Sequence, residues 1–142
     1  MKAVVQRVLS ASVAIDAEVV GAIGHGYVLL VGVEHGDDSA LASRLVDKVL
    51  GLRLFANAQG KLDYDIGHVQ GSILVVSQFT LLADTQRGRR PSFSSAAAPD
   101  EAERLYNEVV QRCAAAVPVQ SGRFGADMQV TLVNDGPFTL VL

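Results

Sequence analysis

The chain has 142 residues, 49% of them hydrophobic, and a formal net charge of −3. This length suits one domain, residues 1–142, whose core buries about two-thirds of the unfolded surface, and the composition excludes a disordered chain. The charge argues against a protein that wraps a nucleic-acid backbone, because that mode needs many Lys and Arg side chains. Contact with a nucleic-acid end remains open.

Strands are predicted over much of the first half. Val-rich segments at residues 2–15 and 18–23, separated by Asp16 and Ala17, indicate a hairpin. The apolar run at residues 27–33 is bounded by glycines and is typical of a central strand buried on both faces. Residues 54–66 predict a two-stranded excursion.

Two amphipathic helices are predicted. The first starts near residue 38, with Asp37, Asp38 or Ser39 as its N-cap. The second starts at Pro99, which suits a first helical turn, and ends before Pro118. Their apolar faces are formed by Leu41, Leu45, Val49 and Leu52 in the first helix, and by Ala102, Leu105, Tyr106, Val109, Val110 and Cys113 in the second.

The strongest strand candidate spans residues 72–82 and turns polar at Ser77, Gln78 and Thr80. A buried strand that becomes polar at its end often presents a site. Thr80 could act as a nucleophile, but no base lies near it in the sequence, and a threonine at a strand end is more often a residue of high strand propensity.

A turn signal lies close to the C-terminus, where residues 134–139 separate two apolar runs. Asn, Asp, Gly and Pro in this order predict a hairpin. Proline has no N–H, so Gly136 and Pro137 can present two carbonyl oxygens with little side chain, and an X-Pro bond is cis in about 5% of folded cases.

Other candidates for side-chain chemistry are weak. The three histidines, His25, His35 and His68, lack metal-ligand spacing and suit solvated turns, so we expect no metal. Cys113 falls on the apolar stripe of a helix, where a thiol is an inert core residue, and a single cysteine fits a reducing compartment. We also expect no membrane segment and a cytoplasmic location, because no apolar run approaches the roughly 20 residues of a span and no signal peptide is evident.

A basic cluster, Arg87, Arg89 and Arg90, lies in the segment 83–98, which reads as a loop. A solvated basic loop is the simpler interpretation, and contact with an RNA end is the alternative. The residues alone therefore indicate a globular α/β domain with a polar pocket.

The chain resembles the D-aminoacyl-tRNA deacylases over essentially its full length. The specific matches are Ser77 to Leu81, the SQFTL segment, and Asn134 to Thr139, the NxGPxT segment. Supporting matches are Gln6 to Val8, Arg87 to Phe93 and Gly122 to Met128. The tract 57–65 departs from the commoner family pattern, which affects only the conformation expected for that excursion.

The resemblance implies a mixed, curved or barrel-like sheet with two amphipathic helices packed outside, assembled as a homodimer with the site at the interface. It implies hydrolysis of the ester between a D-amino acid, or glycine, and the 3′ adenosine of tRNA, as chiral proofreading without a cofactor. A cis Gly136–Pro137 pair would enter the partner's pocket, where its carbonyls capture the α-amino group and refuse an L side chain, with Arg7 holding the pair in place.

In the same reading, backbone N–H groups of Phe79 and Thr80 stabilise the oxyanion, while Ser77 and Gln78 shape the pocket. An older reading makes the Thr80 hydroxyl the nucleophile and ranks second. Arg87, Arg89 and Arg90 are candidate tRNA contacts. The alternatives are an RNA-independent hydrolase of D-amino acid esters, and a dimeric binding module for adenosine-ended RNA or D-amino acids.

Overall fold

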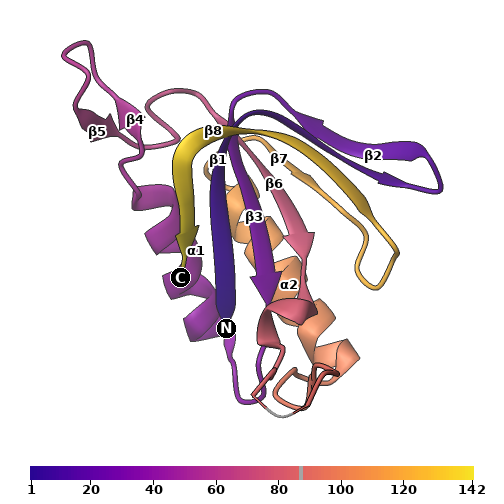
Figure 1. Ribbon diagram of the computed structural model, residues 1–142. Helices are drawn as coiled ribbons and strands as arrows, with labels where there is room; N and C mark the ends of the chain where they lie inside the picture. The colour runs from indigo at the N-terminus through magenta and orange to yellow at the C-terminus, as the bar shows by residue number, and fades with distance from the viewer. Residues whose placement is uncertain (87) are drawn as a thin grey trace.

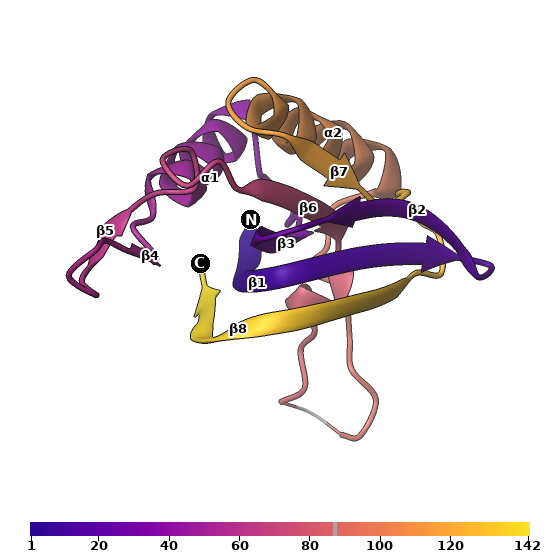
Figure 2. The same ribbon diagram turned by 90° about the horizontal axis from the view of Figure 1, so that it is seen from above.

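The computed structural model describes residues 1–86 and 88–142. A mixed, nearly closed sheet carries two helices on one of its sides, as the view from above shows (Figure 1 and Figure 2). The predicted fold class is confirmed. The elements are β1 (Lys2–Ile15), β2 (Glu18–Ile23), β3 (Gly26–Gly32), α1 (Ser39–Gly51), β4 (Phe55–Ala56), β5 (Leu62–Tyr64), β6 (Ser72–Ser77), the 3-10 helix η1 (Phe79–Leu82), α2 (Pro99–Ala114), β7 (Val119–Ser121) and β8 (Gln129–Val141).

The main sheet has the strand order β2-β1-β3-β6-β7, and β8 pairs with β1. The β1–β2 hairpin and the β4–β5 excursion are antiparallel, as the sequence predicts, and β6 is parallel to β3 and β7. The sheet curls until β2 approaches β7, where a Cβ added at Gly21 would lie 3.2 Å from the Ser121 carbonyl oxygen. A residue with a side chain at position 21 would therefore require β7 to shift slightly.

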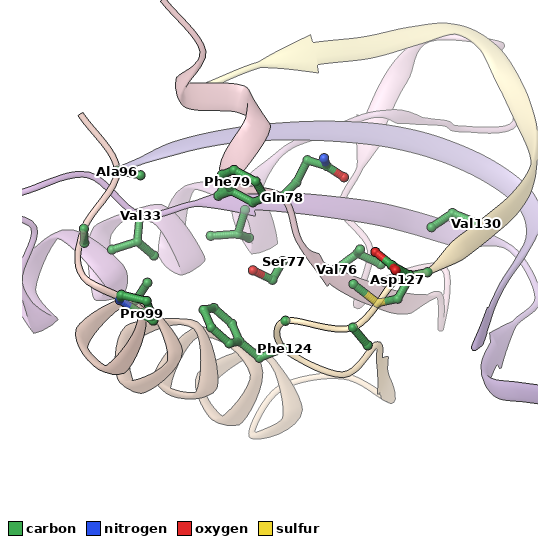
Figure 3. A pocket seen from close by; sticks show the side chains of 16 residues that line it. Val33, Val76, Ser77, Gln78, Phe79, Ala96, Pro99, Phe124, Asp127 and Val130 are labelled. Carbon is green, nitrogen blue, oxygen red and sulfur yellow. The ribbon is translucent and has the colours of Figure 1, made fainter. Parts of the chain in front are cut away.

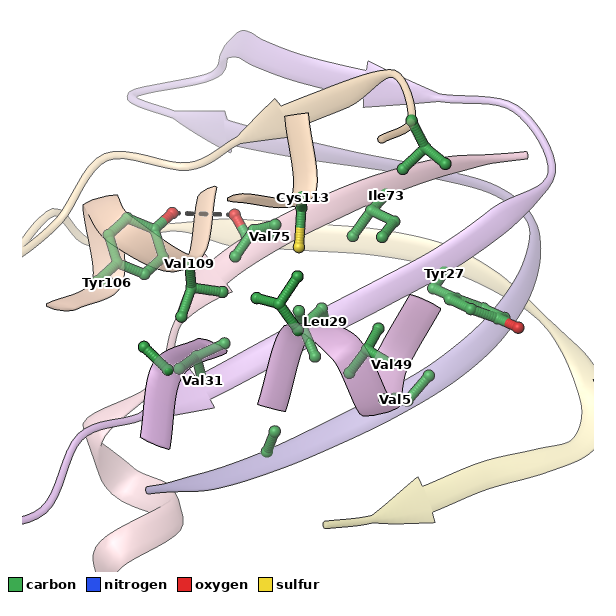
Figure 4. Close-up of a cluster of buried hydrophobic side chains, with 14 of the residues drawn as sticks. Val5, Tyr27, Leu29, Val31, Val49, Ile73, Val75, Tyr106, Val109 and Cys113 are labelled. Carbon is green, nitrogen blue, oxygen red and sulfur yellow. Dashed lines mark hydrogen bonds between the residues drawn. The ribbon is translucent and has the colours of Figure 1, made fainter. Parts of the chain in front are cut away.

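The central strands β3 and β6 lie between two apolar cores, one on each face of the sheet. Side chains alternate across β3, so Tyr27, Leu29 and Val31 face the helices while Val28 faces the inside of the curl. In β6, Ile73 and Val75 alternate with Leu74 and Val76 in the same way. Both faces of the central strands are covered, which explains their continuous apolar runs. Figure 4 shows the core on the helix side.

Both helices begin close to the predicted residues. Asp38 caps α1, its Oδ1 accepting the N–H of Leu41 at 2.8 Å, and Pro99 is the first residue of α2. The buried face of α1 differs from the prediction, because the smaller Ala42 and Val46 face the core and leave Leu41 and Leu45 half-buried at its flank. Within residues 1–86 and 88–142, no helix is long and apolar enough to cross a membrane.

The strand predicted over residues 72–82 ends earlier, at Ser77. The N–H of Gln78 donates to the Val31 carbonyl at 2.8 Å, and the chain then turns into η1. Gly32 allows this turn to lie close, since a Cβ there would be 3.1 Å from the Gln78 carbonyl oxygen. Ser77 is therefore the last residue of β6, and Gln78 and Thr80 lie on the turn that follows the strand.

The hairpin predicted at residues 134–139 is wrong. The apolar runs on both sides of this turn pair with the same strand, β1, so β8 is one long antiparallel strand with a wide bulge. Gln6 pairs with Thr139 and Val8 with Asn134, which leaves Arg7 alone opposite residues 135–138. The Gly136–Pro137 peptide bond is cis. The turn-forming residues form a bulge here and not a hairpin, because the segments on both sides of them pair with β1, at the other end of the chain.

Candidate functional site

A pocket of 530 Å³ opens beside the end of β6, between the start of α2 and the segment that leads into β8 (Figure 3). Most of its wall is apolar, and its polar side chains come from the end of β6, from the residue after it and from Asp127. It is lined by Val31, Val33, Val76, Ser77, Gln78, Phe79, Ala96, Ala97, Pro99, Ala102, Phe124, Gly125, Ala126, Asp127, Met128 and Val130. A concave apolar pocket with few polar groups is the usual form of a small-molecule site.

Three of the predicted site residues, Ser77, Gln78 and Phe79, line this pocket, and Thr80 follows directly in η1. The Gln78 side-chain amide donates to the Thr80 hydroxyl oxygen. In the described part of the chain, the N–H groups of Phe79 and Thr80 donate to no backbone or side-chain acceptor. They occupy the first turn of a helix, where N–H groups lack an intrahelical partner.

Hydrogen bonds to backbone carbonyls join the separate segments of the pocket wall. The Ala97 N–H donates to the Val33 carbonyl at 3.0 Å, and the Ser95 hydroxyl donates to the Leu82 carbonyl at 3.1 Å. The end of β3, the end of η1 and the start of α2 are thereby held together.

Phe124 is a wall residue that rests on the core. The Tyr106 ring lies 6.0 Å from the Phe124 ring, and the Tyr106 hydroxyl donates to the Val75 carbonyl at 3.0 Å (Figure 4). Burial raises the pKa of Tyr106 to about 12, and a hydrogen bond to Ser121 opposes this rise. Sequence reasoning assigned Tyr106 to the core alone and did not identify Phe124 as a pocket residue, although it lies in the segment 122–128 of the family resemblance.

Arg7 is the centre of a second constellation, around the bulge of β8. Its Nε lies 2.8 Å from Asp135 Oδ2, and its Nη1 donates to the Leu54 carbonyl oxygen. Its guanidinium carbon lies 4.1 Å from the centroid of the Phe138 ring and 5.8 Å from that of Phe55. The Arg7 side chain is only 11% exposed, so these contacts hold it in one position.

Gln6, Asn134 and Thr139 close the base of the bulge. The Gln6 amide donates to Asn134 Oδ1 at 3.3 Å and to Thr139 Oγ1 at 3.4 Å, and the Thr139 hydroxyl donates to Asn134 Oδ1 at 3.4 Å. The Asn and Thr of the NxGPxT segment thus bind each other across the base. Gly136 and Pro137 are exposed between them.

The structure does not bring the two predicted constellations together within one chain. Arg7, opposite the bulge, pairs with Tyr27, whereas Ser77 pairs with Val31. These positions are four residues apart along β3, on the order of 13 Å. The bend of β8 accordingly lies at the top of Figure 1 and η1 near its bottom. None of residues 134–139 lines the pocket.

The basic loop extends away from the sheet (Figure 2). Arg89 and Arg90 are exposed on it, while Arg87 lies outside the described residues. Two of the histidines make structural side-chain contacts: His25 Nε2 lies 2.9 Å from the Val69 carbonyl oxygen, and His68 stacks on Tyr64. Where the structure describes the chain, no three His, Cys, Asp or Glu side chains gather closely enough to hold a metal ion.

Comparison with known proteins gives consistent matches. A family model described as D-Tyr-tRNA(Tyr) deacylase matches residues 4–142. Curated proteins named D-aminoacyl-tRNA deacylase from Pasteurella multocida (strain Pm70) and from Citrobacter koseri are each 54% identical to this chain, over 100% of it and 99% of their own length.

Two solved structures are similar in fold. One, described as "c-Myc DNA Unwinding Element Binding Protein", is 39% identical, has a TM-score of 0.94, and the match covers 100% of this chain and 97% of that one. The other, described as "Structural Analysis of a probable eukaryotic D-amino acid tRNA deacylase", is 16% identical with a TM-score of 0.85 and coverage of 99% and 97%. The second likeness shows a shared fold alone.

The fold is thus one that tRNA deacylases and their structural relatives share. The chain belongs to the D-Tyr-tRNA(Tyr) deacylase family, which confirms the resemblance read from its motifs.

Proposed function

We propose that this protein hydrolyses the ester that joins a D-amino acid, or glycine, to the 3′ adenosine of tRNA, releasing the amino acid and the tRNA. The observation that carries this proposal is the 54% identity, over the whole chain, to proteins named D-aminoacyl-tRNA deacylase. The apolar pocket beside Ser77, Gln78 and Phe79 is the site where the terminal adenosine and its ester would bind. The cytoplasm is the location that we propose for this reaction, because it holds the tRNA substrate.

The catalytic groups we assign are backbone N–H groups of Phe79 and Thr80. Both are in the first turn of η1 beside the pocket, where they can donate to the oxyanion of a tetrahedral intermediate. An aminoacyl ester is already reactive, and the neighbouring ribose 2′-OH can orient the attacking water, so positioning supplies much of the rate. Ser77 and Gln78 shape the wall around the ester.

The Thr80 hydroxyl ranks second as the catalytic group. Its oxygen accepts a hydrogen bond from the Gln78 amide, and an amide cannot serve as the general base that a hydroxyl nucleophile requires. This contact favours the interpretation in which the Thr80 side chain is held in place while its backbone N–H donates to the oxyanion.

Chiral selection is assigned to Gly136 and Pro137, acting in the pocket of a second copy of the chain. The pair is exposed, and its own pocket lies on the order of 13 Å away along the sheet. Carbonyl oxygens of this pair would accept hydrogen bonds from the α-ammonium group of the substrate, and the backbone would collide with an L side chain. Arg7 would fix the orientation of the pair through Asp135 and Phe138.

The free edge of β8 supports a homodimer with the site at the interface. Within the described residues β8 pairs only with β1, so its other edge offers backbone groups to a partner. Apolar side chains are exposed on these two strands, with Leu9 at 59%, Val133 at 50% and Val141 at 78%. An isologous dimer would bury them and would place each bulge near the partner's pocket.

Arg89 and Arg90 are the described residues that we assign to tRNA phosphates, and Arg87 is a third candidate outside the described residues. Few phosphate contacts are needed when the terminal adenosine is the main element bound, which fits the net charge of −3. Replacing Arg89 and Arg90 with Ser should raise KM for tRNA and reduce its salt dependence.

The test is deacylation of matched D- and L-aminoacyl-tRNA by the purified protein, with the free D-amino acid methyl ester as a third substrate. We expect rapid loss of the D-aminoacyl-tRNA, persistence of the L-ester, and little turnover of the methyl ester. Loss of neither tRNA ester, or of both at equal rates, would overturn the proposal. Equal turnover of the methyl ester and the tRNA ester would indicate an RNA-independent esterase. Binding of the tRNA ester without its hydrolysis would indicate a binding module.

A further inference from the structure

An exposed aromatic ring stands at the rim of the pocket without a role in the proposed chemistry. The Phe79 side chain is 56% exposed and is one of the side chains that line the pocket in Figure 3. Its ring packs edge to face on the half-buried ring of Phe93, with centroids 4.9 Å apart and planes at 65°. Phe93 therefore supports the Phe79 ring from one side. The rest of the ring faces solvent, and a ligand that covered it would gain the favourable free energy of burying apolar surface.

Phe79 and Phe93 are located where the basic loop joins the body of the protein. Phe79 precedes the loop, Phe93 is on its returning limb, and Asp84 and Ser92 connect the two limbs through backbone hydrogen bonds of 2.7 and 2.9 Å. The exposed ring is thus held in a fixed position relative to the root of the loop that carries Arg89 and Arg90. An aromatic face next to cationic side chains is the combination that proteins use to hold single-stranded nucleic acid.

The size of the pocket determines what can reach this ring. A cavity of 530 Å³ is in the range that holds one ligand of drug size, so it suits one nucleoside with its aminoacyl group. The next nucleotide of an RNA chain must lie outside. The exposed Phe79 ring at the rim, on the side of the basic loop, is the surface available to its base.

We propose that the Phe79 ring, backed by Phe93, stacks on the base of the second nucleotide from the RNA 3′ end, while Arg89 and Arg90 attract the phosphates that follow. This inference rests on the proposed function and adds a second binding subsite to it. Stacking on an aromatic ring is tolerant of base identity, so the subsite would recognise the presence of a base and not its sequence. The charge of the adjoining loop favours RNA over a second copy of the chain as the occupant.

The experiment uses three synthetic esters of one D-amino acid: the 3′ ester of adenosine, that of the dinucleotide CpA, and that of a dinucleotide whose first residue is abasic. With the full-length protein, we expect kcat/KM for CpA to exceed that for adenosine by about tenfold, given the usual contribution of one stacked base. The abasic dinucleotide retains the phosphate, and it should lose most of this gain.

Phe79→Leu keeps the backbone N–H and removes the aromatic face. We expect it to reduce the ratio of kcat/KM for CpA over adenosine to near one, whereas Val19→Ala, at a side chain exposed by 59% on β2, should leave the ratio unchanged. Equal turnover of the three esters by the wild-type protein would overturn the proposed subsite, and this result does not depend on whether the variant folds. An unchanged ratio in Phe79→Leu overturns it, and weaker self-association of that variant would identify a second copy of the chain as the occupant. Failure to hydrolyse any ester, including D-aminoacyl-tRNA, refutes the proposed function instead.

Discussion

Arg7 contacts residues on both sides of the exposed Gly136–Pro137 pair: Asp135, whose Oδ2 lies 2.8 Å from the arginine Nε, and Phe138, whose ring centroid lies 4.1 Å from the guanidinium carbon. One side chain from β1 therefore anchors the bulge before and after the pair. The Leu54 carbonyl accepts from the same guanidinium and links this anchor to the segment before β4.

Replacing Arg7 with Lys keeps the charge but removes the planar group that makes these contacts together. We expect kcat/KM for D-aminoacyl-tRNA to fall at least about tenfold and the free energy of unfolding to fall by about 1–2 kcal/mol, the scale of one charged hydrogen bond with a cation–π contact. Single-turnover kinetics and urea titration measure the two effects. Arg53→Lys is the control, because that side chain is 70% exposed in its ion pair with Asp63. Equal effects of both changes would remove Arg7 from the mechanism.

Thr80→Ala separates the two catalytic readings. The variant keeps the backbone N–H and loses the hydroxyl that accepts from Gln78. We expect kcat within about threefold of wild type, because the loss of one exposed hydrogen bond shifts free energies by less than about 1 kcal/mol. Complete loss of turnover in a folded variant would instead establish the hydroxyl as nucleophile. Asn107→Ala on the exposed side of α2 controls for nonspecific effects.

Filling the pocket tests whether the substrate binds there. Ala102 lines the pocket from α2, and Ala102→Leu would extend a branched side chain into the cavity. KM for D-aminoacyl-tRNA should rise about tenfold or more, with stability changed by less than about 1.5 kcal/mol because the added atoms enter open space. Steady-state kinetics and thermal unfolding check both. Ala116→Leu, at an exposed position after α2, should leave KM unaltered; an equal rise there would refute the assignment.

Alkaline pH should destabilise the protein through Cys113. Burial raises the pKa of this thiol from its ordinary value of 9.0 to about 11, so the folded state favours the protonated form. Its contribution to stability is complete below pH 9 and is lost as pH rises from 9 to 11, by on the order of 2–3 kcal/mol. Cys113→Ala should be less stable than wild type at pH 7 because of the cavity, and urea titrations should show this difference shrinking above pH 9. A constant difference would contradict the effect.

Local signals in the sequence were sufficient for the elements that depend on neighbouring residues. Asp38 caps α1 and Pro99 starts α2 through interactions within one turn, so both helix starts could be predicted. Asp16 and Ala17 take positive φ in the β1–β2 turn for a similarly local reason.

Interactions between distant segments could not be read in this way. Residues 134–139 carry local hairpin chemistry, yet their conformation is set by pairing with β1 at the other end of the chain. The pocket wall joins Val33, Phe124 and Pro99 from three separate segments, and no spacing in the sequence connects them. The family resemblance identified both motifs, but their separation within one chain became visible only in the structure.

The long pairing of β1 with β8 also bears on how the protein folds. Gln6 and Thr139, which bind each other at the base of the bulge, are 133 positions apart in the sequence. Contacts of such high separation carry a large loop-closure entropy and tend to form late. The bulge that we assign to chiral selection would therefore be completed when the outermost strand docks, so that partly folded chains would lack the element needed to discriminate between substrates.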